Sequence, residues 1–295
     1  SDPSAPSVDR LAALGSLVSP EAPWEPAFFA GVPEHGPSTG VVGADLRLSP
    51  SQATLYDQCP RRYVLDRRLR AIDTESPYLA FGSIIHEVLE LAERQALSVT
   101  RPHAQLEQAL LHLDSVWAEK ADFGTPEVNR AWYRRAHELL AEIYGNWPGG
   151  DEPPVALELD MAASIGGVDW IGRADRVDRA DGGVKVVDYK TSRTPPNLKE
   201  AGSSLQLGFY LLAAAEHPRL REAGPPVAAE LWYPLARSSR KTFPFDMEQL
   251  DKVREALDQV ARNILAEDWT PKVGRHCDRC DFRRVCPAWP EGRSI

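Results

Sequence analysis

The stretch that decides the fold runs from Ile171 to Ser192 and reads IGRADRVDRADGGVKVVDYKTS. Two short apolar segments, Val168–Ile171 and Val184–Val187, lie on either side of an Asp-Gly-Gly sequence at 181–183. Apolar segments joined by a turn of this composition are typical of a β-hairpin. The sequence therefore predicts a hairpin at the centre of the chain.

Polar residues that could form a site follow both apolar segments. Asp175 follows the first, and Asp188 and Lys190 follow the second in a D-x-K pattern. Residues i and i+2 of an extended strand lie on the same side, so Asp188 and Lys190 are expected to point into one space. Asp175 could reach this space from the neighbouring strand.

Two carboxylates and a lysine that lie together can bind a divalent metal ion and act on a phosphate group. Carboxylate oxygens hold Mg²⁺ or Mn²⁺, which keeps bound water and accepts phosphate oxygens. The lysine could orient the water or offset negative charge. This pattern indicates hydrolysis of a phosphodiester. The alternative is a hairpin whose Asp and Lys form exposed ion pairs, which contribute little energy.

Length and composition limit the class of protein. The chain has 295 residues, of which 43% are hydrophobic, enough for one sizeable core with appendages or for two small domains. No apolar run approaches the roughly 18 to 20 residues that span a bilayer, and the N-terminus does not read as a signal peptide. These features predict a cytoplasmic protein without a membrane partner.

Charge is unevenly distributed along the chain. The net charge of -9 argues against general electrostatic attraction to nucleic acid. Two segments are nevertheless basic: residues 59–70 hold five arginines and one aspartate, and residues 272–286 hold five cationic residues and two aspartates. Both segments contain cysteines. If the cysteines meet in space, the two segments form one basic surface suited to phosphate. The alternative is two separate, solvated helices.

Seven prolines within residues 1–45 predict a linker or an arm lying on another surface. A helix should begin at the Ser49 cap, with Gln52 completing a capping box, and end near Arg70. Hydrophobic periodicity predicts further helices over 83–96, 103–120, 127–146, 203–217 and 247–266, and strands over 155–165, 227–235 and 241–245. This order predicts an α/β fold in which helices flank a mixed sheet.

Four further residues could contribute to the site. His86 lies in an apolar helical stretch, where a histidine is more often a core residue than a ligand, although it would still need a polar partner. Glu158 is either an additional acid near the site or an exposed strand residue. Gln206 and Tyr210 are four residues apart, which places both on one face of a helix.

The four cysteines are Cys59, Cys277, Cys280 and Cys286. The two-residue spacing between Cys277 and Cys280 is typical of metal chelation. Disulfides are the weaker alternative, because nothing in the sequence indicates an oxidising compartment. Spacing alone leaves zinc and an iron–sulfur cluster equally open. Either group would tie the first helix to the C-terminal segment.

Six motifs in collinear order resemble the RecB family of nucleases within the PD-(D/E)xK superfamily. They are SPSQ with CPRRY from Ser49, FGSIIH from Phe81, GRADRVD from Gly172, VVDYKTS from Val186, QLGFY from Gln206 and the closing C-x2-C-x5-C. The resemblance covers about residues 46–286. It is closest to the branch with an iron–sulfur cluster, which includes AddB and AdnAB helicase-nucleases and CRISPR-associated RecB-like exonucleases. One departure is Ala174, where the superfamily pattern has proline.

The resemblance implies a role for each matched residue. His86, Asp175, Asp188 and the Tyr189 carbonyl would bind Mg²⁺ or Mn²⁺, and Lys190 would position or activate the attacking water. Gln206 and Tyr210 would support the site and DNA. A [4Fe-4S] cluster would be held by Cys59, Cys277, Cys280 and Cys286. The implied domain limits are 1–45 for a Pro-rich arm, 46–286 for the nuclease domain and 287–295 for a tail.

The resemblance also implies a function. The expected activity is metal-dependent hydrolysis of DNA, exonucleolytic and on single strands, by the nuclease domain of a helicase-nuclease that processes double-strand breaks. No G-x4-G-K-[S/T] phosphate loop occurs in the chain, so a helicase motor would lie elsewhere. The alternatives are a stand-alone RecB-like exonuclease, a non-catalytic DNA-binding module stabilised by the cluster, and a zinc-stapled interaction domain.

Overall fold

A computed structural model describes residues 41–43, 45–71, 76–146, 152–192, 195, 204–236, 239–244 and 246–288. Almost all of the predicted arm over 1–45 lies outside these residues, as does most of the predicted tail over 287–295. The chain divides into two compact units. The first comprises Ser1–Asp73, Gly166–Val168 and Leu257–Ile295, and the second comprises Thr74–Ile165 and Asp169–Ala256.

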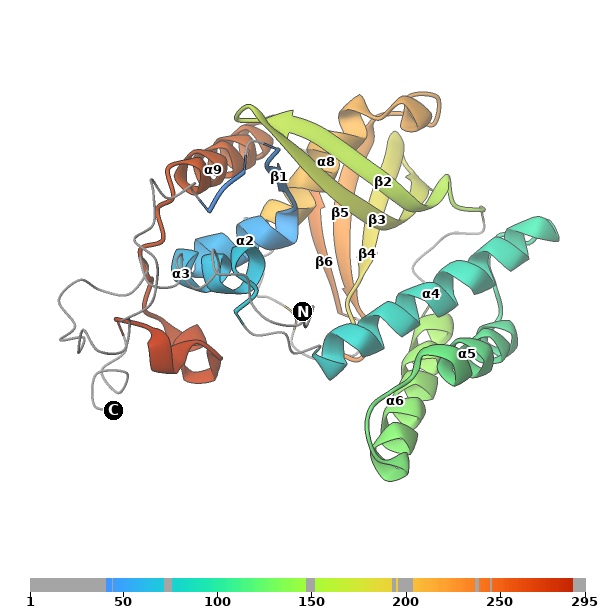
Figure 1. Cartoon of the computed structure of the whole chain (residues 1–295). Coiled ribbons are helices and arrows are strands. Elements are labelled where there is room, and N and C mark those ends of the chain that lie inside the picture. The colour runs from blue at the N-terminus through green and yellow to red at the C-terminus, as the bar shows by residue number, and fades with distance from the viewer. Residues whose placement is uncertain are drawn as a thin grey trace. The chain divides into compact units, whose positions relative to one another are not determined.

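A mixed β-sheet forms the centre of the second unit (Figure 1). Strand β3 pairs antiparallel with β4, β4 pairs parallel with β5, and β5 pairs antiparallel with β6, while β2 also pairs with β3. The strands are β2 (Ala156–Ile165), β3 (Val168–Ala180), β4 (Gly183–Tyr189), β5 (Pro226–Tyr233) and β6 (Ser239–Pro244). The mixed sheet predicted from the sequence is confirmed.

The predicted hairpin is the pair β3–β4. Its register joins Ala180 to Gly183 and Arg176 to Val187, with a two-residue turn at Asp181 and Gly182. Gly182 has a φ of 84°, a left-handed conformation that glycine adopts without steric cost. The Asp-Gly turn therefore fixes the register of the two strands that carry the predicted acids.

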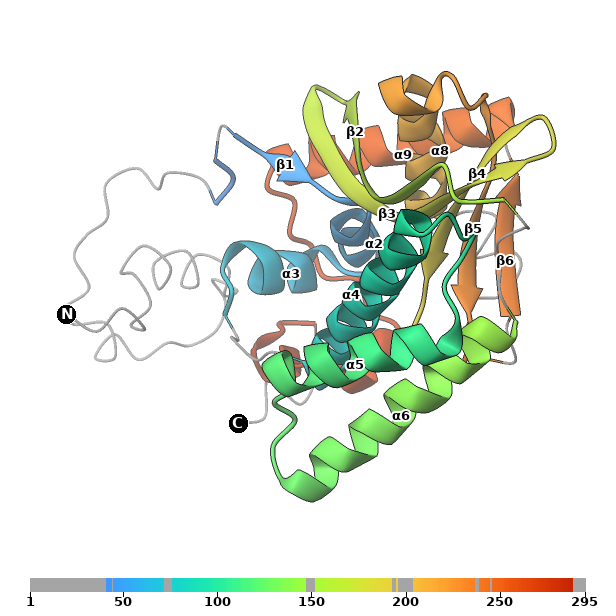
Figure 2. The same ribbon diagram turned by 90° about the vertical axis from the view of Figure 1, so that its right-hand side faces the viewer.

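Three helices cover one face of the sheet: α4 (Pro77–Ser98), α5 (Leu106–Lys120) and α6 (Pro126–Gly145). Figure 2 shows α5 and α6 beside α4. Their apolar side chains form one core with Val187, Tyr189 and Trp232 of the sheet. The sequence predicted these helices, but α4 begins six residues earlier than the predicted start at 83, because Pro77 opens its first turn.

Helix α8 (Leu205–Glu216) lies in the connection between the parallel strands β4 and β5, as such crossovers require, and packs against the sheet. It also packs against the first part of α9 (Met247–Leu265). A Cβ atom at Gly208 would lie 2.5 Å from a methyl carbon of Val253, so only glycine allows this approach. A short 3₁₀ turn, Pro218–Leu220, follows α8.

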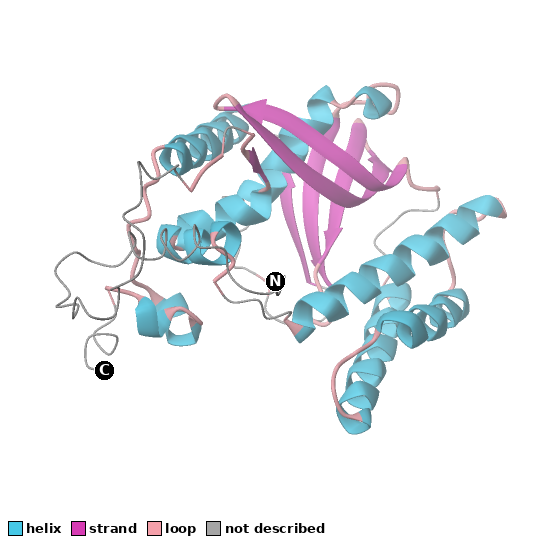
Figure 3. Cartoon of the chain, viewed as in Figure 1, coloured by secondary structure: helices cyan, strands magenta, loops and turns pink. Residues whose placement is uncertain are grey.

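The first unit corrects the predicted helix over residues 49–70. That segment contains α2 (Pro50–Gln58), α3 (Pro60–Tyr63) and a π-helical turn, Val64–Arg68. The break lies at Cys59, which is extended (φ -163°, ψ 108°) because a residue before proline is disfavoured in the α conformation. Helices and strands are distinguished by colour in Figure 3.

The N-terminal cap of α2 is confirmed, but the capping box is not. The Ser49 hydroxyl accepts a hydrogen bond from the amide of Gln52 at 3.3 Å. The side chain of Gln52 instead accepts from the hydroxyl of Tyr63. The remaining elements of this unit are the two-residue strand β1 (Arg47–Leu48), the end of α9 and two 3₁₀ turns, Arg275–Arg279 and Arg283–Val285. Among the described residues, no helix has the length and apolar character needed to cross a membrane.

Candidate active site

The two predicted acids lie level with each other at one end of the β3–β4 hairpin. The register that pairs Arg176 with Val187 places Asp175 opposite Asp188. Neighbours on β4, Val187 and Tyr189, contribute to the core beneath α4–α6, so Asp188 between them faces the opposite side. Hairpin geometry therefore brings two carboxylates together at a buried position.

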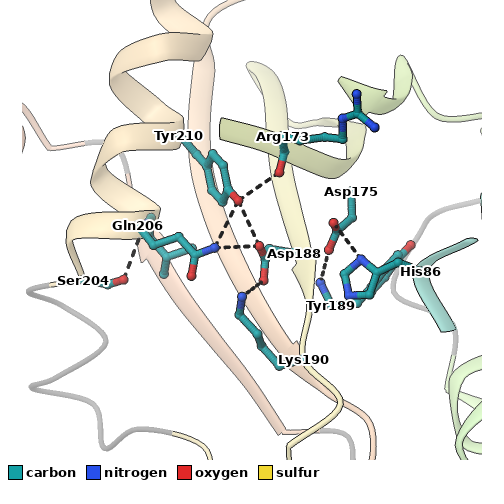
Figure 4. A network of polar contacts seen from close by, with 10 residues as sticks. His86, Arg173, Asp175, Asp188, Tyr189, Lys190, Ser204, Gln206 and Tyr210 are labelled. Atoms are coloured by element: carbon teal, nitrogen blue, oxygen red, sulfur yellow. Dashed lines mark hydrogen bonds and ion pairs between the residues drawn. The ribbon is translucent and has the colours of Figure 1, made fainter. Parts of the chain in front are cut away.

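Asp188 is the centre of a polar network (Figure 4). Its Oδ1 accepts hydrogen bonds from Gln206 Nε2 at 2.9 Å and from the Tyr210 hydroxyl at 3.0 Å. Its Oδ2 lies 2.5 Å from the ammonium of Lys190. The sequence prediction that Asp188 and Lys190 point into one space is thus confirmed.

Burial and charge set the protonation of this pair. Burial raises the pKa of Asp188 and the carboxylate of Asp175 adds to this rise, while Lys190 opposes it. Burial lowers the pKa of Lys190, but the carboxylates of Asp188 and Asp175 outweigh burial and the net pKa is raised. Lys190 is therefore a cation held against Asp188.

Asp175 joins β3 to helix α4 and to strand β4. Its Oδ1 lies 3.0 Å from Nδ1 of His86, and its Oδ2 accepts a hydrogen bond from the amide of Tyr189 at 2.5 Å. Burial disfavours protonation of His86, but Asp175, Asp188 and Glu158 together outweigh it and raise the pKa of the imidazole to about 9. His86, which the sequence alone favoured as a core residue, is thus paired with an acid.

Glu158 on β2 is the third acid at this site. His86, Glu158 and Asp175 each offer one possible ligand atom, and these three atoms lie within 4.8 Å of one another. Glu158 has a φ of 46°, which is uncommon for a residue with a side chain. Burial, followed by the charge of Asp175, raises the pKa of Glu158 to about 7. The structure thus supports the interpretation of Glu158 as an additional acid near the site.

These pKa shifts predict how the stability of the metal-free protein depends on pH. His86 binds its proton more tightly in the folded chain (pKa about 9) than in the unfolded chain (6.5), so its contribution is complete below 6.5 and is lost as pH rises through 9. Glu158 acts in the same direction between pH 4.5 and about 7, because its folded carboxylate is disfavoured. The His86 contribution is on the order of 3 kcal/mol.

Thermal unfolding in a chelator, followed from pH 5 to 9 by circular dichroism, checks this expectation. His86→Gln should flatten the upper part of the pH dependence, and Glu158→Gln should flatten the lower part. The expectation would be contradicted if the melting temperature of the wild type fell with rising pH no more steeply than the melting temperatures of the two variants.

Helix α8 supplies the pair Gln206 and Tyr210 from its first two turns. Gln206 Nε2 donates to the Tyr210 hydroxyl at 3.1 Å, and that hydroxyl also lies 3.0 Å from the carbonyl oxygen of Arg173. A Cβ atom at Gly172 would lie 2.9 Å from the Phe209 ring, so glycine lets α8 approach β3 closely. Ala174, at the position where the superfamily pattern has proline, is fully buried.

A buried ionic network beside the site was not predicted from the sequence. The guanidinium of Arg176, 0% exposed, donates to Glu93, 1% exposed, at 3.1 Å, and to Asp178 at 2.5 Å. Glu93 also accepts from the Ala104 amide and the Tyr144 hydroxyl, each at 3.1 Å. Glu93 lies two turns after His86 on α4, and Arg176 directly follows Asp175. The network therefore joins the two elements that carry the His86–Asp175 pair.

The four cysteines lie in the first unit, where they line a common pocket with Arg61, Arg62 and Phe282, among others. All four thiols are free. Among the described residues, which include every cysteine, no three thiols lie within 4.8 Å of one another. Cys59 contributes to this pocket from the break between α2 and α3.

The site thus combines two acids, a lysine and an imidazole at one end of the central strands of a mixed sheet. The family model of the PD-(D/E)XK nuclease superfamily matches residues 47–287, so the chain belongs to this superfamily.

Three similar proteins illustrate the range of relatives. The Gene 69 protein of Mycobacterium phage L5 is 24% identical over 287 residues, which cover 82% of this chain and 96% of the phage protein. One of the chains of the ATP-dependent helicase/deoxyribonuclease of Clostridium botulinum (strain Loch Maree / Type A3) is 28% identical over 208 residues, 58% of this chain but 18% of that relative. A solved structure from Eubacterium rectale, assigned as an exonuclease, has a TM-score of 0.49, with 15% identity and coverage of 81% of this chain and 89% of its own.

Proposed function

We propose that this chain is a divalent-metal-dependent DNA nuclease whose site is formed by His86, Asp175, Asp188, the Tyr189 carbonyl and Lys190. The observation that carries the proposal is the hairpin register, which sets Asp175 opposite Asp188, with His86 paired to Asp175 and Lys190 paired to Asp188. Membership of a nuclease superfamily supports the same reaction class.

The donor atoms fit a divalent cation. Carboxylate oxygens are the ligands that Mg²⁺ and Mn²⁺ prefer. Possible ligand atoms of His86, Asp175 and Glu158 lie within 4.8 Å of one another, and Asp188, which is not in this group, lies opposite Asp175 on the hairpin. An imidazole suits Mn²⁺ better than Mg²⁺, because Mg²⁺ favours oxygen ligands. We therefore expect stronger activity with Mn²⁺. When bound, the cation would polarise the phosphodiester and lower the pKa of a bound water.

The protein side chains would supply orientation and charge. Lys190, held as a cation by Asp188, would orient the attacking water and offset the negative charge that develops on the phosphate. Gln206 and Tyr210 would keep Asp188 in one orientation, because both donate to the same oxygen. The Tyr189 amide and His86 would do the same for Asp175.

The proposed substrate is single-stranded DNA, digested from an end, in the cytoplasm. The similarity to one segment of a helicase/deoxyribonuclease subunit supports a helicase motor as partner, on the same or another chain. Such a pairing would suit the processing of double-strand breaks, the role proposed here. The alternative is a stand-alone exonuclease. This alternative is supported by the phage Gene 69 protein, which aligns over 96% of its length.

Digestion of end-labelled linear single strands, compared with circular single strands and with duplex, tests the proposal. Mn²⁺-dependent shortening of the linear strand alone, abolished by a chelator, is the expected result. Cleavage of the circle would replace the exonuclease assignment with an endonuclease. DNA binding without any cleavage would favour a non-catalytic module or a dependence on the helicase motor.

A [4Fe-4S] cluster on the four cysteines is the second part of the proposal. A tetrahedral zinc site requires thiolate sulfurs roughly 3.8 Å apart, closer than the arrangement of these thiols, whereas a four-iron cluster binds each thiolate at a different iron. The Nε groups of Arg61 and Arg62 are buried without a hydrogen-bond partner, and both residues line the pocket. Cluster sulfurs are acceptors for such donors, so the pocket fits the cluster.

Replacing Cys59 or Cys280 by alanine is expected to remove bound iron and its visible absorption. Because the cluster would close a loop from Cys59 to Cys277, its loss should destabilise the chain by up to about 5 kcal/mol, by analogy with a cross-link. Iron analysis and urea unfolding check both effects, with Val285→Ala as a control in the same segment. Purified protein that holds zinc and no iron would contradict the proposal.

A further inference from the structure

An exposed apolar pair opens helix α4 on the face that carries His86. Tyr78 and Leu79 are 63% and 69% exposed, although both lie in the first turn of a 22-residue helix whose other face is core. Leu79, Gly82 and His86 follow the spacing i, i+3, i+7 and so form one stripe, which Tyr78 borders. The exposed pair therefore lies about 10 Å along the helix from the His86 imidazole.

The same stripe passes the end of strand β4. A Cβ atom at Gly82 would lie 3.6 Å from the hydroxyl of Thr191, the residue that follows Lys190. Gly82 thus lies between the candidate active site and the exposed pair, and no side chain projects from it. A single strand with a phosphate at the candidate active site could extend along this stripe toward Tyr78.

The ring of Tyr78 packs against an aromatic cluster. Its ring meets Trp132 edge to face, with centroids 5.2 Å apart, and Trp132 stacks on Phe123. The guanidinium of Arg135 lies 5.4 Å from the Trp132 ring and 5.6 Å from the Phe81 ring. Tyr78 is thus 63% exposed while its ring is anchored on Trp132, and the same Trp132 ring carries the Arg135 cation.

We propose that Tyr78 and Leu79 form a stacking platform for a base of the strand that enters the active site. Unpaired bases stack on exposed aromatic rings without regard to sequence, and a nearby arginine favours the polyanion. Duplex bases are already stacked on each other, so the platform selects single strands. This inference rests on the proposed nuclease function, because that function places a phosphate at Asp188.

The test compares Tyr78→Ala, Tyr78→Phe and wild type. Binding of a fluorescent oligonucleotide is measured by anisotropy in Ca²⁺, with an abasic oligonucleotide of equal length and charge as second probe. Leu111→Ala, which removes an equally exposed leucine (67%) from α5, is the control. Tyr78→Ala should bind the normal strand about 5- to 150-fold more weakly and the abasic strand unchanged, while Tyr78→Phe binds like wild type.

A parallel assay of Mn²⁺-dependent cleavage distinguishes failure of the stacking platform from failure of the proposed nuclease function. Cleavage by wild type combined with equal binding by Tyr78→Ala and wild type would overturn the platform and leave the nuclease intact. Base-dependent binding that Tyr78→Ala loses, without cleavage by wild type, would support the platform and count against the nuclease. An equal loss of normal and abasic binding in Tyr78→Ala would also overturn the platform, because stacking requires a base.

Discussion

Asp188→Asn is expected to slow DNA cleavage by roughly 10³-fold or more while the fold remains intact. Asparagine has the size of aspartate and can still accept the hydrogen bonds of Gln206 and Tyr210. It has no negative charge, so it would neither bind a divalent cation well nor form the ion pair with Lys190. Single-turnover digestion of end-labelled single strands in Mn²⁺ measures the rate.

Asp160→Asn provides the matched control. Asp160 lies on β2, is 80% exposed and pairs with Arg173, an exposed ion pair that contributes little. It should retain wild-type cleavage and stability. If Asp188→Asn cleaved as fast as Asp160→Asn, Asp188 would have no role in the reaction, and the assignment of the whole D-x-K segment would be wrong.

The sequence predicted best where geometry is local. The Asp-Gly turn and the period of two along a strand determine that Asp188 and Lys190 share a side, and the structure gives a 2.5 Å ion pair. The register that brings Asp175 level with Asp188 follows from the same turn. None of this depends on distant parts of the chain, which is why one short stretch could predict it.

Features that depend on distant packing were harder to predict. His86 could be recognised only through the family resemblance, since its partner Asp175 is 89 positions away. Glu158 breaks the regular alternation of β2 through its positive φ, which a period-two pattern does not indicate. At Cys59 the signal was present, because Pro60 follows it, and the prediction of an uninterrupted helix overlooked that signal.

Arg176→Met is expected to cause a large loss of stability, about 3 to 5 kcal/mol. Arg176 is the cation between Glu93 and Asp178, and its removal would leave two buried carboxylates without it. Burial already raises the pKa of Glu93, and Arg176 opposes that rise. Urea unfolding at pH 7 measures the change in the free energy of unfolding.

Arg179→Met is the control from the same strand, because Arg179 is 57% exposed and its ion pair with Glu152 lies at the surface. A triple variant, Arg176→Met with Glu93→Leu and Asp178→Leu, should recover part of the loss, since it removes the unpaired carboxylates as well. Equal stability of Arg176→Met and Arg179→Met would contradict the role of the network.

Arg176→Met and Asp188→Asn should also differ in which property they lose, stability or cleavage activity. Arg176 pairs with Glu93 and Asp178, whereas the charge of Asp188 is paired with Lys190. We therefore expect Arg176→Met, studied at low temperature where it remains folded, to keep more cleavage activity than Asp188→Asn, although it is the less stable protein. The reverse order would mean that the position of α4, rather than the charge of Asp188, limits the reaction.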